Sequence, residues 1–315
     1  MHGKCAVVFG GAGFLGSWLC ERLLRDGAQK VLAVDNLITG SERNLESLKK
    51  DTRFAWLKHD VTQPLSLEGS WHYVFNLASP ASPIHYMTHW LETMRAGSLG
   101  TENGLHLARK HGAVFLQAST SEIYGDPTVH PQTEEYWGNV SCTGPRAVYD
   151  EAKRYGEAMV YGFQRNWGTE TRLVRFFNTY GPRMQLHDGR VVPAFVGQVL
   201  EGQDFTVFGD GSQTRSFCYC EDLIDGIVRL ALSNVKEPVN IGNPREMTIL
   251  QFAEAVMKAA GHNGKISFKP LPKDYPKQRK PDITRARTLL GWEPKVTLEE
   301  GLPKTIEYFR GVVGR

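Results

Sequence analysis

The chain has 315 residues, of which 41% are hydrophobic and 23% charged, with a net charge of +3 from 37 basic and 34 acidic residues. This length allows two lobes, and the composition is typical of soluble globular proteins. The nearly balanced charge gives no support for a nucleic-acid partner, and without an apolar run of about 18 residues no membrane partner is expected. His85 and His89 share a helix face but lack a third ligand nearby, so no metal is expected.

The cysteines and the first residues of the chain indicate in which cellular compartment the protein is expected. The five cysteines are few and irregularly spaced, which predicts reduced thiols. The first predicted strand begins almost at the N-terminus and leaves no room for a signal peptide. The sequence therefore predicts a cytoplasmic protein.

The first apolar run, residues 5–9, ends in a turn with glycines three positions apart, at Gly10, Gly13 and Gly16. An amphipathic stretch over 14–24 follows, so the predicted order is strand, tight turn, helix. Glycine in such a turn tolerates positive φ and lets a pyrophosphate approach the N–H groups at the helix start. The pattern is a variant of the dinucleotide-binding turn.

A second apolar run, residues 31–34, ends in Asp35, which lies 19 residues after Gly16. A dinucleotide-binding unit places an acidic residue about there to bind the adenosine ribose hydroxyls. Since this anion repels a 2′-phosphate, Asp35 favours NAD over NADP. The alternative is a carboxylate that only caps the end of the strand.

Strands and helices alternate through the first half of the chain. The predicted strands are 53–57, 73–78, 113–118 and 171–175, and the predicted helices are 41–50, 89–111 and 149–166. This alternation predicts an α/β fold, a Rossmann-type doubly wound parallel sheet with ligands outside the carboxyl ends of its strands.

The pattern changes from about Gly181 onward. The predicted helices are 191–200, 221–232, 248–260 and 298–309, the predicted strands are 205–208 and 239–241, and 269–281 is a predicted loop. We therefore predict a dinucleotide-binding domain over residues 1–180, to which some later elements return, and a smaller α/β lobe over residues 181–315.

Tyr149 and Lys153 are four residues apart on a predicted helix, so the phenol and the ammonium share one face. An unperturbed tyrosine has a pKa of about 10 and is a poor base at neutral pH. The Lys153 cation and a positive nicotinamide are expected to lower it. Tyr149 then takes a proton from a substrate hydroxyl while hydride leaves.

Several stretches together are more specific than these general motifs. They are 10–16, 119–127, 136–138, 144–146, 149–154, 177–183, 188–192, 211–215, 279–283 and 291–294. With them the chain resembles the extended short-chain dehydrogenases/reductases over nearly its whole length, and most closely the UDP-glucuronate decarboxylase (UDP-xylose synthase) family.

The resemblance implies a reaction sequence. NAD oxidises C4 of UDP-glucuronate, the 4-keto sugar loses its carboxylate as CO2, the enolate is protonated at C5, and NADH returns the hydride to give UDP-xylose. The rival activities are a nucleotide-sugar 4,6-dehydratase or a 4-epimerase. A rival of another class is a non-catalytic protein that binds NAD or a nucleotide sugar.

The resemblance also implies the site residues. The catalytic set is Thr120, Ser121, Glu122, Tyr149, Lys153 and Arg279. The NAD-binding set is Gly10, Gly13, Phe14, Leu15, Asp35, Asn36, Thr39, Gly40, Asp60, Val61, Leu77, Ala78, Ser79, Ser119, Tyr149 and Lys153. The substrate-binding set, placed mainly in the second lobe, is Pro80, Glu122, Asn178, Arg190, Val191, Val192, Phe208, Arg215 and Arg279.

Three of these assignments have alternatives. Glu122 is expected to steer the proton at C5, directly or through water, but it can instead serve as a cap or in an ion pair. Arg279 is expected to bind the sugar carboxylate and reject neutral glucose, but it can be a solvated loop cation. Phe208 is a candidate uracil contact or a core residue.

The chain departs from the family pattern at three places, one of which is the stretch Met87-Thr88-His89-Trp90. Ala96-Gly97 stands where the family has Thr-Asn, which affects one cofactor contact and the local helix. Ser141-Cys142-Thr143 replaces Asn-Pro-Ile near the expected substrate entrance. The family also pairs two long helices per subunit, so 89–111 and 149–166 are expected to form the four-helix interface of a homodimer.

Overall fold

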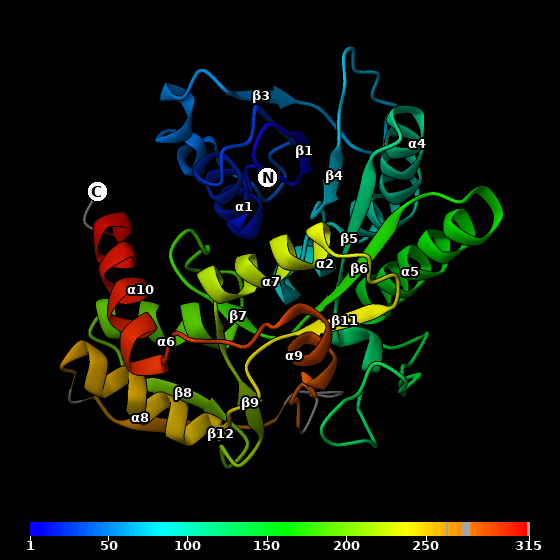
Figure 1. Cartoon of the computed structure of the whole chain (residues 1–315). Coiled ribbons are helices and arrows are strands. Elements are labelled where there is room, and N and C mark those ends of the chain that lie inside the picture. Colours follow the sequence, from blue (N-terminus) through cyan, green and yellow to red (C-terminus); the bar gives the residue numbers. More distant parts are fainter. Residues whose placement is uncertain (263, 272–277, 314–315) are drawn as a thin grey trace.

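The computed structural model describes residues 1–262, 264–271 and 278–313, and a seven-stranded sheet in the order β11-β6-β5-β4-β1-β2-β3 lies at its centre. All neighbouring pairs in this sheet are parallel. The strands are β1 Cys5–Phe9, β2 Lys30–Asp35, β3 Phe54–Lys58, β4 Tyr73–Asn76, β5 Val114–Thr120, β6 Thr171–Phe176 and β11 Pro238–Ile241. The predicted Rossmann-type fold is confirmed (Figure 1). The strand order reverses beside β1, where such sheets bind ligands.

Helices cover both faces of this sheet because its strands are apolar on both sides. Val7 and Val8 are adjacent in β1, yet they lie in two different cores on opposite faces. One core includes residues of α1 (Phe14–Arg25) and α7 (Cys220–Leu232), and the other includes residues of α4 (Thr101–His111) and α5 (Ala147–Trp167). Continuous apolar strands of this kind are typical of parallel sheets.

The predicted helix over 41–50 is wrong in type. The chain instead forms two 3₁₀ turns, Glu42–Leu45 and Leu48–Lys50. Leu45 ends the first turn and Leu48 begins the second, and both side chains are buried in the core that includes residues of α1.

The predicted helix over 89–111 begins earlier and is divided. It consists of α2 (Pro83–Thr88), α3 (Trp90–Arg95), a π-helical turn (Ala96–Gly100) and α4. A Cβ atom on Gly97 would lie 2.7 Å from the Cβ of Ala152 on α5. Gly97 therefore allows α5 to pack closely against the π-helical turn, and this is the structural consequence of the Ala96-Gly97 departure.

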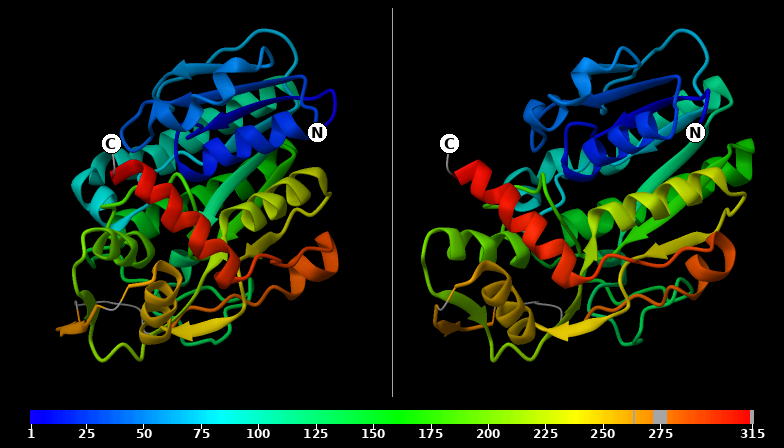
Figure 2. Two further views of the ribbon diagram at one scale, coloured as in Figure 1. Left: turned by 90° about the vertical axis from the view of Figure 1, so that its left-hand side faces the viewer. Right: turned by 60° about the vertical axis from the view of Figure 1, so that its left-hand side comes forward.

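The second lobe packs around its own apolar core. Its elements are β7 (Thr179–Tyr180), α6 (Val191–Leu200), β8 (Phe205–Phe208), β9 (Thr214–Ser216), β10 (Cys218–Tyr219), β12 (Glu246–Thr248), α8 (Ile249–Ala260), β13 (Ile266–Lys269) and α10 (Leu298–Val313). Thr248 and Gln251 form a capping box that begins α8, as the threonine cap predicted. In both views of Figure 2, α10 runs from this lobe toward the sheet.

Several elements beyond residue 180 lie with the central sheet. They are α7, β11 and α9 (Thr284–Leu290), of which β11 forms one edge of the sheet. The predicted loop over 269–281 begins with the last residue of β13, and its residues 272–277 lie outside the described residues.

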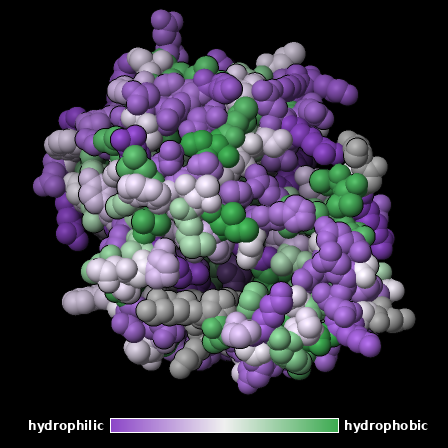
Figure 3. Space-filling view, turned by 180° about the vertical axis from the view of Figure 1, so that it is seen from behind, coloured by the Kyte–Doolittle hydropathy of each residue, from purple (hydrophilic) through white to green (hydrophobic). Residues whose placement is uncertain are grey.

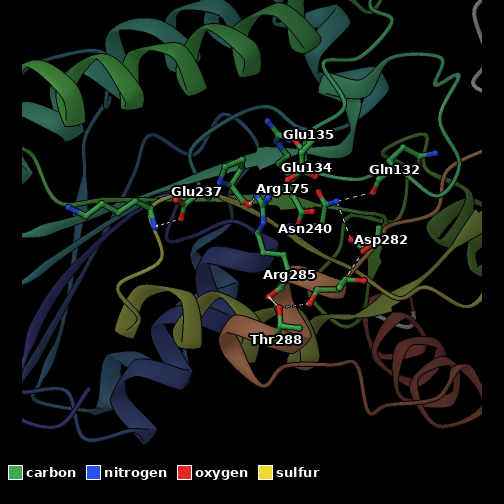
Figure 4. A network of polar contacts seen from close by, with 12 residues as sticks. Gln132, Glu134, Glu135, Arg175, Glu237, Asn240, Asp282, Arg285 and Thr288 are labelled. Atoms are coloured by element: carbon green, nitrogen blue, oxygen red, sulfur yellow. Dashed lines mark hydrogen bonds and ion pairs between the residues drawn. The ribbon is translucent and has the colours of Figure 1, made fainter.

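A buried polar network fixes the segment 278–283 against the sheet (Figure 4). The Asn240 amide on β11 donates to the carbonyls of Gln132 and Asp282, at 3.0 and 3.2 Å. The backbone N–H of Gln132 donates to the carbonyl of Lys280, and the Gln132 side chain accepts from the N–H of Lys280, each at 2.9 Å. Residues far apart in the sequence thus hold Arg279 in one place.

The close approach at Gly97 gives a prediction for stability. Gly97→Ala forces Ala152 or the π-helical turn to move, so we expect a loss of about 1–3 kcal/mol in the free energy of unfolding, measured with urea. Gly311→Ala is the matched control, because nothing lies within 4 Å of a Cβ at that helical glycine. The control should be neutral or stabilising by up to about 1 kcal/mol. Equal effects of the two substitutions would contradict the packing argument.

Candidate active site

The glycine turn after β1 leaves backbone donors exposed to a cavity. Gly10 has φ 76°, and a Cβ there would lie 2.8 Å from the backbone nitrogen of Ala78. Helix α1 starts after Gly13 without a side-chain cap, so its first N–H groups are available to an anion. The turn lines a cavity of about 550 Å³.

Asp35 at the end of β2 is buried and orders the loops around it. Its carboxylate accepts hydrogen bonds from the N–H groups of Ala12 at 3.0 Å and Leu37 at 2.8 Å. Burial raises the pKa of Asp35, and these amide bonds oppose that rise. A Cβ on Gly40 would lie 2.8 Å from the carboxylate, so Gly40 provides the room that Asp35 needs.

The predicted NAD-binding residues gather in two neighbouring cavities. The larger one is lined by Gly10, Gly13, Phe14, Leu15, Thr39, Leu77, Ser79, Ser119, Tyr149 and Lys153. The smaller one, about 120 Å³, is lined by Asp35, Asn36, Asp60, Val61 and Ala78, and also by Gly10, Gly13, Thr39, Leu77 and Ser79. Pro80, predicted to bind substrate, lines this smaller cavity. The donors, the carboxylate and the room at the turn fit a dinucleotide.

Tyr149 and Lys153 lie on one face of α5, both buried, beside the larger cavity. The Lys153 ammonium donates to the carbonyl of Ala118 at 3.0 Å and lies 5.7 Å from the Tyr149 ring centre. Burial lowers the pKa of Lys153 to about 8.

The expected lowering of the Tyr149 pKa is not found in the chain by itself. Burial raises the pKa of this phenol, the negative charge of Glu122 adds to the rise, and a hydrogen bond with Thr120 opposes it. Lys153 is held by the Ala118 carbonyl and does not offset the burial. Tyr149 is therefore a neutral acid in this structure.

A third cavity, about 220 Å³, adjoins the largest one and shares Leu15, Thr120, Tyr149 and Arg190 with it. Most predicted catalytic and substrate residues line it, namely Thr120, Ser121, Glu122, Tyr149, Asn178, Arg190, Val191, Val192, Arg215 and Arg279. Phe208 does not line any of these three cavities and is 39% exposed on β8. Figure 3 shows a hollow with hydrophilic residues near the middle of the rear face.

Glu122 is held between two arginines. Its carboxylate forms ion pairs with Arg146, at the start of α5, and with Arg279, from the segment 278–283. Burial alone raises the pKa of Glu122, but the charges of Arg279 and Arg146 outweigh it and bring this pKa down to about 2. Glu122 is therefore ionised at neutral pH. The Nε of Arg279 is buried and has no partner among the described residues.

Sequence reasoning missed Arg146 and Tyr86 as members of the site. The guanidinium of Arg146 lies 5.9 Å from the Tyr86 ring centre, and this ring stacks on Tyr149 with 5.0 Å between centres. Arg146 lies one helical turn before Tyr149 and within the recognised stretch 144–146, which was the signal available for it. Tyr86 had no comparable signal.

Among the described residues, no three His, Cys, Asp or Glu side chains gather as metal ligands.

The sequence matches the NAD dependent epimerase/dehydratase family over residues 6–242. The chain is 51% identical over 307 residues to UDP-glucuronic acid decarboxylase 1 of Xenopus tropicalis, covering 98% of this chain and 72% of that protein. It is 47% identical over 304 residues to UDP-glucuronic acid decarboxylase 3 of Arabidopsis thaliana, covering 96% of this chain and 88% of that protein.

Solved structures of nucleotide-sugar enzymes have the same fold. The UDP-glucose 4-epimerase of Thermotoga maritima with UDP-glucose gives a TM-score of 0.90 at 30% identity, covering 98% of this chain and all of that one. The UDP-glucuronic acid 4-epimerase of Bacillus cereus, in complex with UDP-glucuronic acid and NAD, gives 0.88 at 27% identity over 98% of this chain and all of that one.

The clamp around Glu122 predicts a pH-dependent stability. A depressed pKa stabilises the fold fully above the ordinary value of 4.5, and this stability is lost as pH falls toward about 2. Arg146→Met leaves Glu122 with one guanidinium, so we expect a loss of about 2 kcal/mol in the free energy of unfolding at pH 7. As pH falls below 4.5, the variant should lose less stability than the wild type does.

The control for this prediction is Arg310→Met, which removes a surface ion pair with Glu307. It should change the unfolding free energy by less than about 0.5 kcal/mol. An effect of Arg146→Met as small as that of the control at pH 7 would mean that the Arg146–Glu122 ion pair does not stabilise the fold.

Proposed function

Because this chain belongs to the NAD-dependent epimerase/dehydratase family, we propose that it converts UDP-glucuronate to UDP-xylose and carbon dioxide. The observation that carries this proposal is the identity of 47–51% to UDP-glucuronic acid decarboxylases over nearly the whole chain. The site supports it, since cationic groups for a sugar acid lie beside a phenol suited to C4 chemistry.

The glycine turn and Asp35 would hold NAD, because the free N–H groups at the start of α1 suit a pyrophosphate and the carboxylate suits the ribose hydroxyls. When bound, NAD⁺ would supply the acceptor for the hydride at C4 of the sugar and, once reduced, the donor that returns it after loss of CO2. The remaining chemistry belongs to the side chains of this chain.

Tyr149 takes the proton from the C4 hydroxyl, and Thr120 orders the phenol and the sugar oxygen. The phenol is neutral when the chain is alone, so a neighbouring positive charge from the bound cofactor is what makes it a base. Lys153, whose pKa of about 8 leaves it mostly protonated at pH 7, keeps positive charge beside this site.

The C4 ketone makes the sugar a β-keto acid. Two arginines against one glutamate leave a net positive charge for the C6 carboxylate, and the unpaired Nε of Arg279 adds a donor. When the C5–C6 bond breaks, its electron pair moves toward the C4 oxygen and CO2 leaves without needing a proton. Ser121, whose side chain is a hydroxyl and not an acid, suits this step.

A 4-epimerase is the second candidate, because the solved 4-epimerases share this fold over the whole chain. The product separates the two activities. UDP-glucuronate with NAD⁺ should give CO2 and UDP-xylose, identified by mass and proton NMR. UDP-galacturonate without CO2 would establish epimerisation instead. A released 4-keto pentose would show that the reaction ends after loss of CO2, before hydride returns to C4.

Tyr149→Phe tests the proposed base. Removing the hydroxyl should lower kcat about 10³-fold while NAD still binds, because a positioned acid–base group contributes about that much. Tyr155→Phe, an exposed tyrosine on the same helix, is the control and should keep full activity. Full turnover in Tyr149→Phe would contradict the mechanism, and loss of turnover with NAD still bound would exclude a mere binding protein.

We further propose a cytoplasmic homodimer. All five cysteines are free and three are buried, which suits a reducing compartment. No helix in the described part of the chain is long and apolar enough to cross a membrane. An exposed apolar strip on α2 and α3, made of Ile84, Met87, Trp90, Leu91 and Met94, supports pairing with a second copy.

Met94→Glu should convert the dimer to a monomer in light scattering, because it places a charge within the apolar strip. Leu232→Glu is the control, since Leu232 is also exposed but lies at the end of α7. The control should remain dimeric. A wild-type chain that is monomeric at micromolar concentration would refute the homodimer.

A further inference from the structure

A separate cavity of about 260 Å³ lies behind Glu122. It shares Glu122 and Arg146 with the substrate cavity, so this ion pair forms the boundary between the two. Exposed side chains of Asp126 and Ser141 lie on its outer side. Its size is enough for several water molecules, since one water occupies about 30 Å³ in the liquid.

Asp150 lies in this cavity and has no role in the proposed steps so far. It follows Tyr149 on α5, is 6% exposed, and its Oδ1 is buried without a hydrogen-bond partner among the described residues. A buried carboxylate without donors favours its neutral form. Asp150 is thus an acid that can hold a proton near neutral pH.

The charged and titratable groups around Asp150 come from every neighbouring element. They are Glu122 after β5, Arg146 at the start of α5, Arg279 from the segment 278–283, Tyr86 on α2, and Tyr149 and Glu151 on α5. Burial and the negative charge of Glu122 raise the pKa of Asp150 to about 7, although Arg146 and Arg279 act in the opposite direction.

The proposed reaction needs one proton that no assigned residue can supply. A carboxylate that leaves as neutral CO2 is replaced by hydrogen, so each turnover consumes one proton from solvent. Glu122 is ionised down to about pH 2 and stores none. Tyr149 must keep the proton it took from C4, because the C4 oxygen needs it again when the ketone is reduced.

We propose that Asp150 stores the proton that replaces the carboxylate at C5 and releases it to the sugar across Glu122. This inference rests on the proposed function. After the C5–C6 bond breaks, its electron pair lies in the C4–C5 enolate. Asp150 gives its proton through water in the cavity to the Glu122 carboxylate, which passes it to C5, so that a C5–H bond forms and Glu122 is ionised again. Solvent then returns a proton to Asp150.

The charges at the site agree with this assignment. With Asp150 protonated, Glu122, Arg146 and Arg279 carry a net charge of +1, which matches the single charge of the sugar carboxylate. With Asp150 ionised, the cluster is neutral and attracts the sugar carboxylate less strongly. Asp150 acts through Glu122 and not on the sugar itself, so it is a positioning residue that holds and relays a proton.

Asp150→Asn is the test, with Asp126→Asn as the matched control in the same cavity. In the wild type, kcat should fall as pH rises above about 7, because Asp150 loses its proton there. Asp150→Asn should lower kcat about 100-fold, change KM less than threefold and remove this pH dependence. Asp150→Glu should restore part of kcat and part of its pH dependence. Asp126→Asn should behave like the wild type.

Two further readouts separate a proton relay from a purely structural role. Slow protonation at C5 delays the return of hydride. NADH, detected by its absorbance at 340 nm, should therefore accumulate during turnover in Asp150→Asn but not in the wild type. Without substrate, the raised pKa makes wild-type stability fall as pH rises from about 4 to about 7. Asp150→Asn lacks this loss, so its Tm should rise relative to the wild type across that window.

The outcomes are distinct. If the wild type releases no CO2, the proposed function fails, while the Tm comparison still tests whether Asp150 holds a proton near neutral pH. If the wild type is active and Asp150→Asn keeps its kcat and pH profile, the relay is refuted alone. A Tm difference that does not change with pH would also refute it.

Discussion

The neutralisation of one partly buried carboxylate organises the site. Glu122 is stable where it lies because Arg146 and Arg279 meet it from two other parts of the chain. An isolated buried charge costs several kcal/mol, so neither arginine can move away independently. The network through Gln132 and Asn240 fixes the segment that carries Arg279. Polar contacts outside the cavity thereby determine the charge inside it.

The parallel sheet brings the two halves of the chemistry together. Thr120 ends β5, and Tyr149 follows the start of α5, so both lie at the carboxyl edge where the cofactor and substrate cavities meet. Close helix packing at Gly97 keeps α5 near this edge. The fold therefore places the phenol between a dinucleotide and a sugar with little freedom to move.

Environment, more than residue type, sets the protonation state of each group. Glu122 is partly buried and Asp150 is buried, and both carboxyl groups lie near the same arginines, yet their pKa values are about 2 and about 7. Only Glu122 forms ion pairs with those arginines, and Asp150 has an unpaired oxygen. Lys153 with a pKa of about 8 and Tyr149 with a raised pKa differ from their free side chains for the same reason, which is burial.

The sequence by itself determined the features that depend on local periodicity and turn chemistry. These are the strand, glycine turn and helix around Gly10, the acid at Asp35, and the shared face of Tyr149 and Lys153. Only the tertiary structure decided that Arg146 meets Glu122 and that Oδ1 of Asp150 has no hydrogen-bond partner in the described part of the chain. It also decided that Pro80 and Phe208 lie outside the substrate cavity. Burial and charge pairing join residues more than a hundred positions apart, and no local pattern records such contacts.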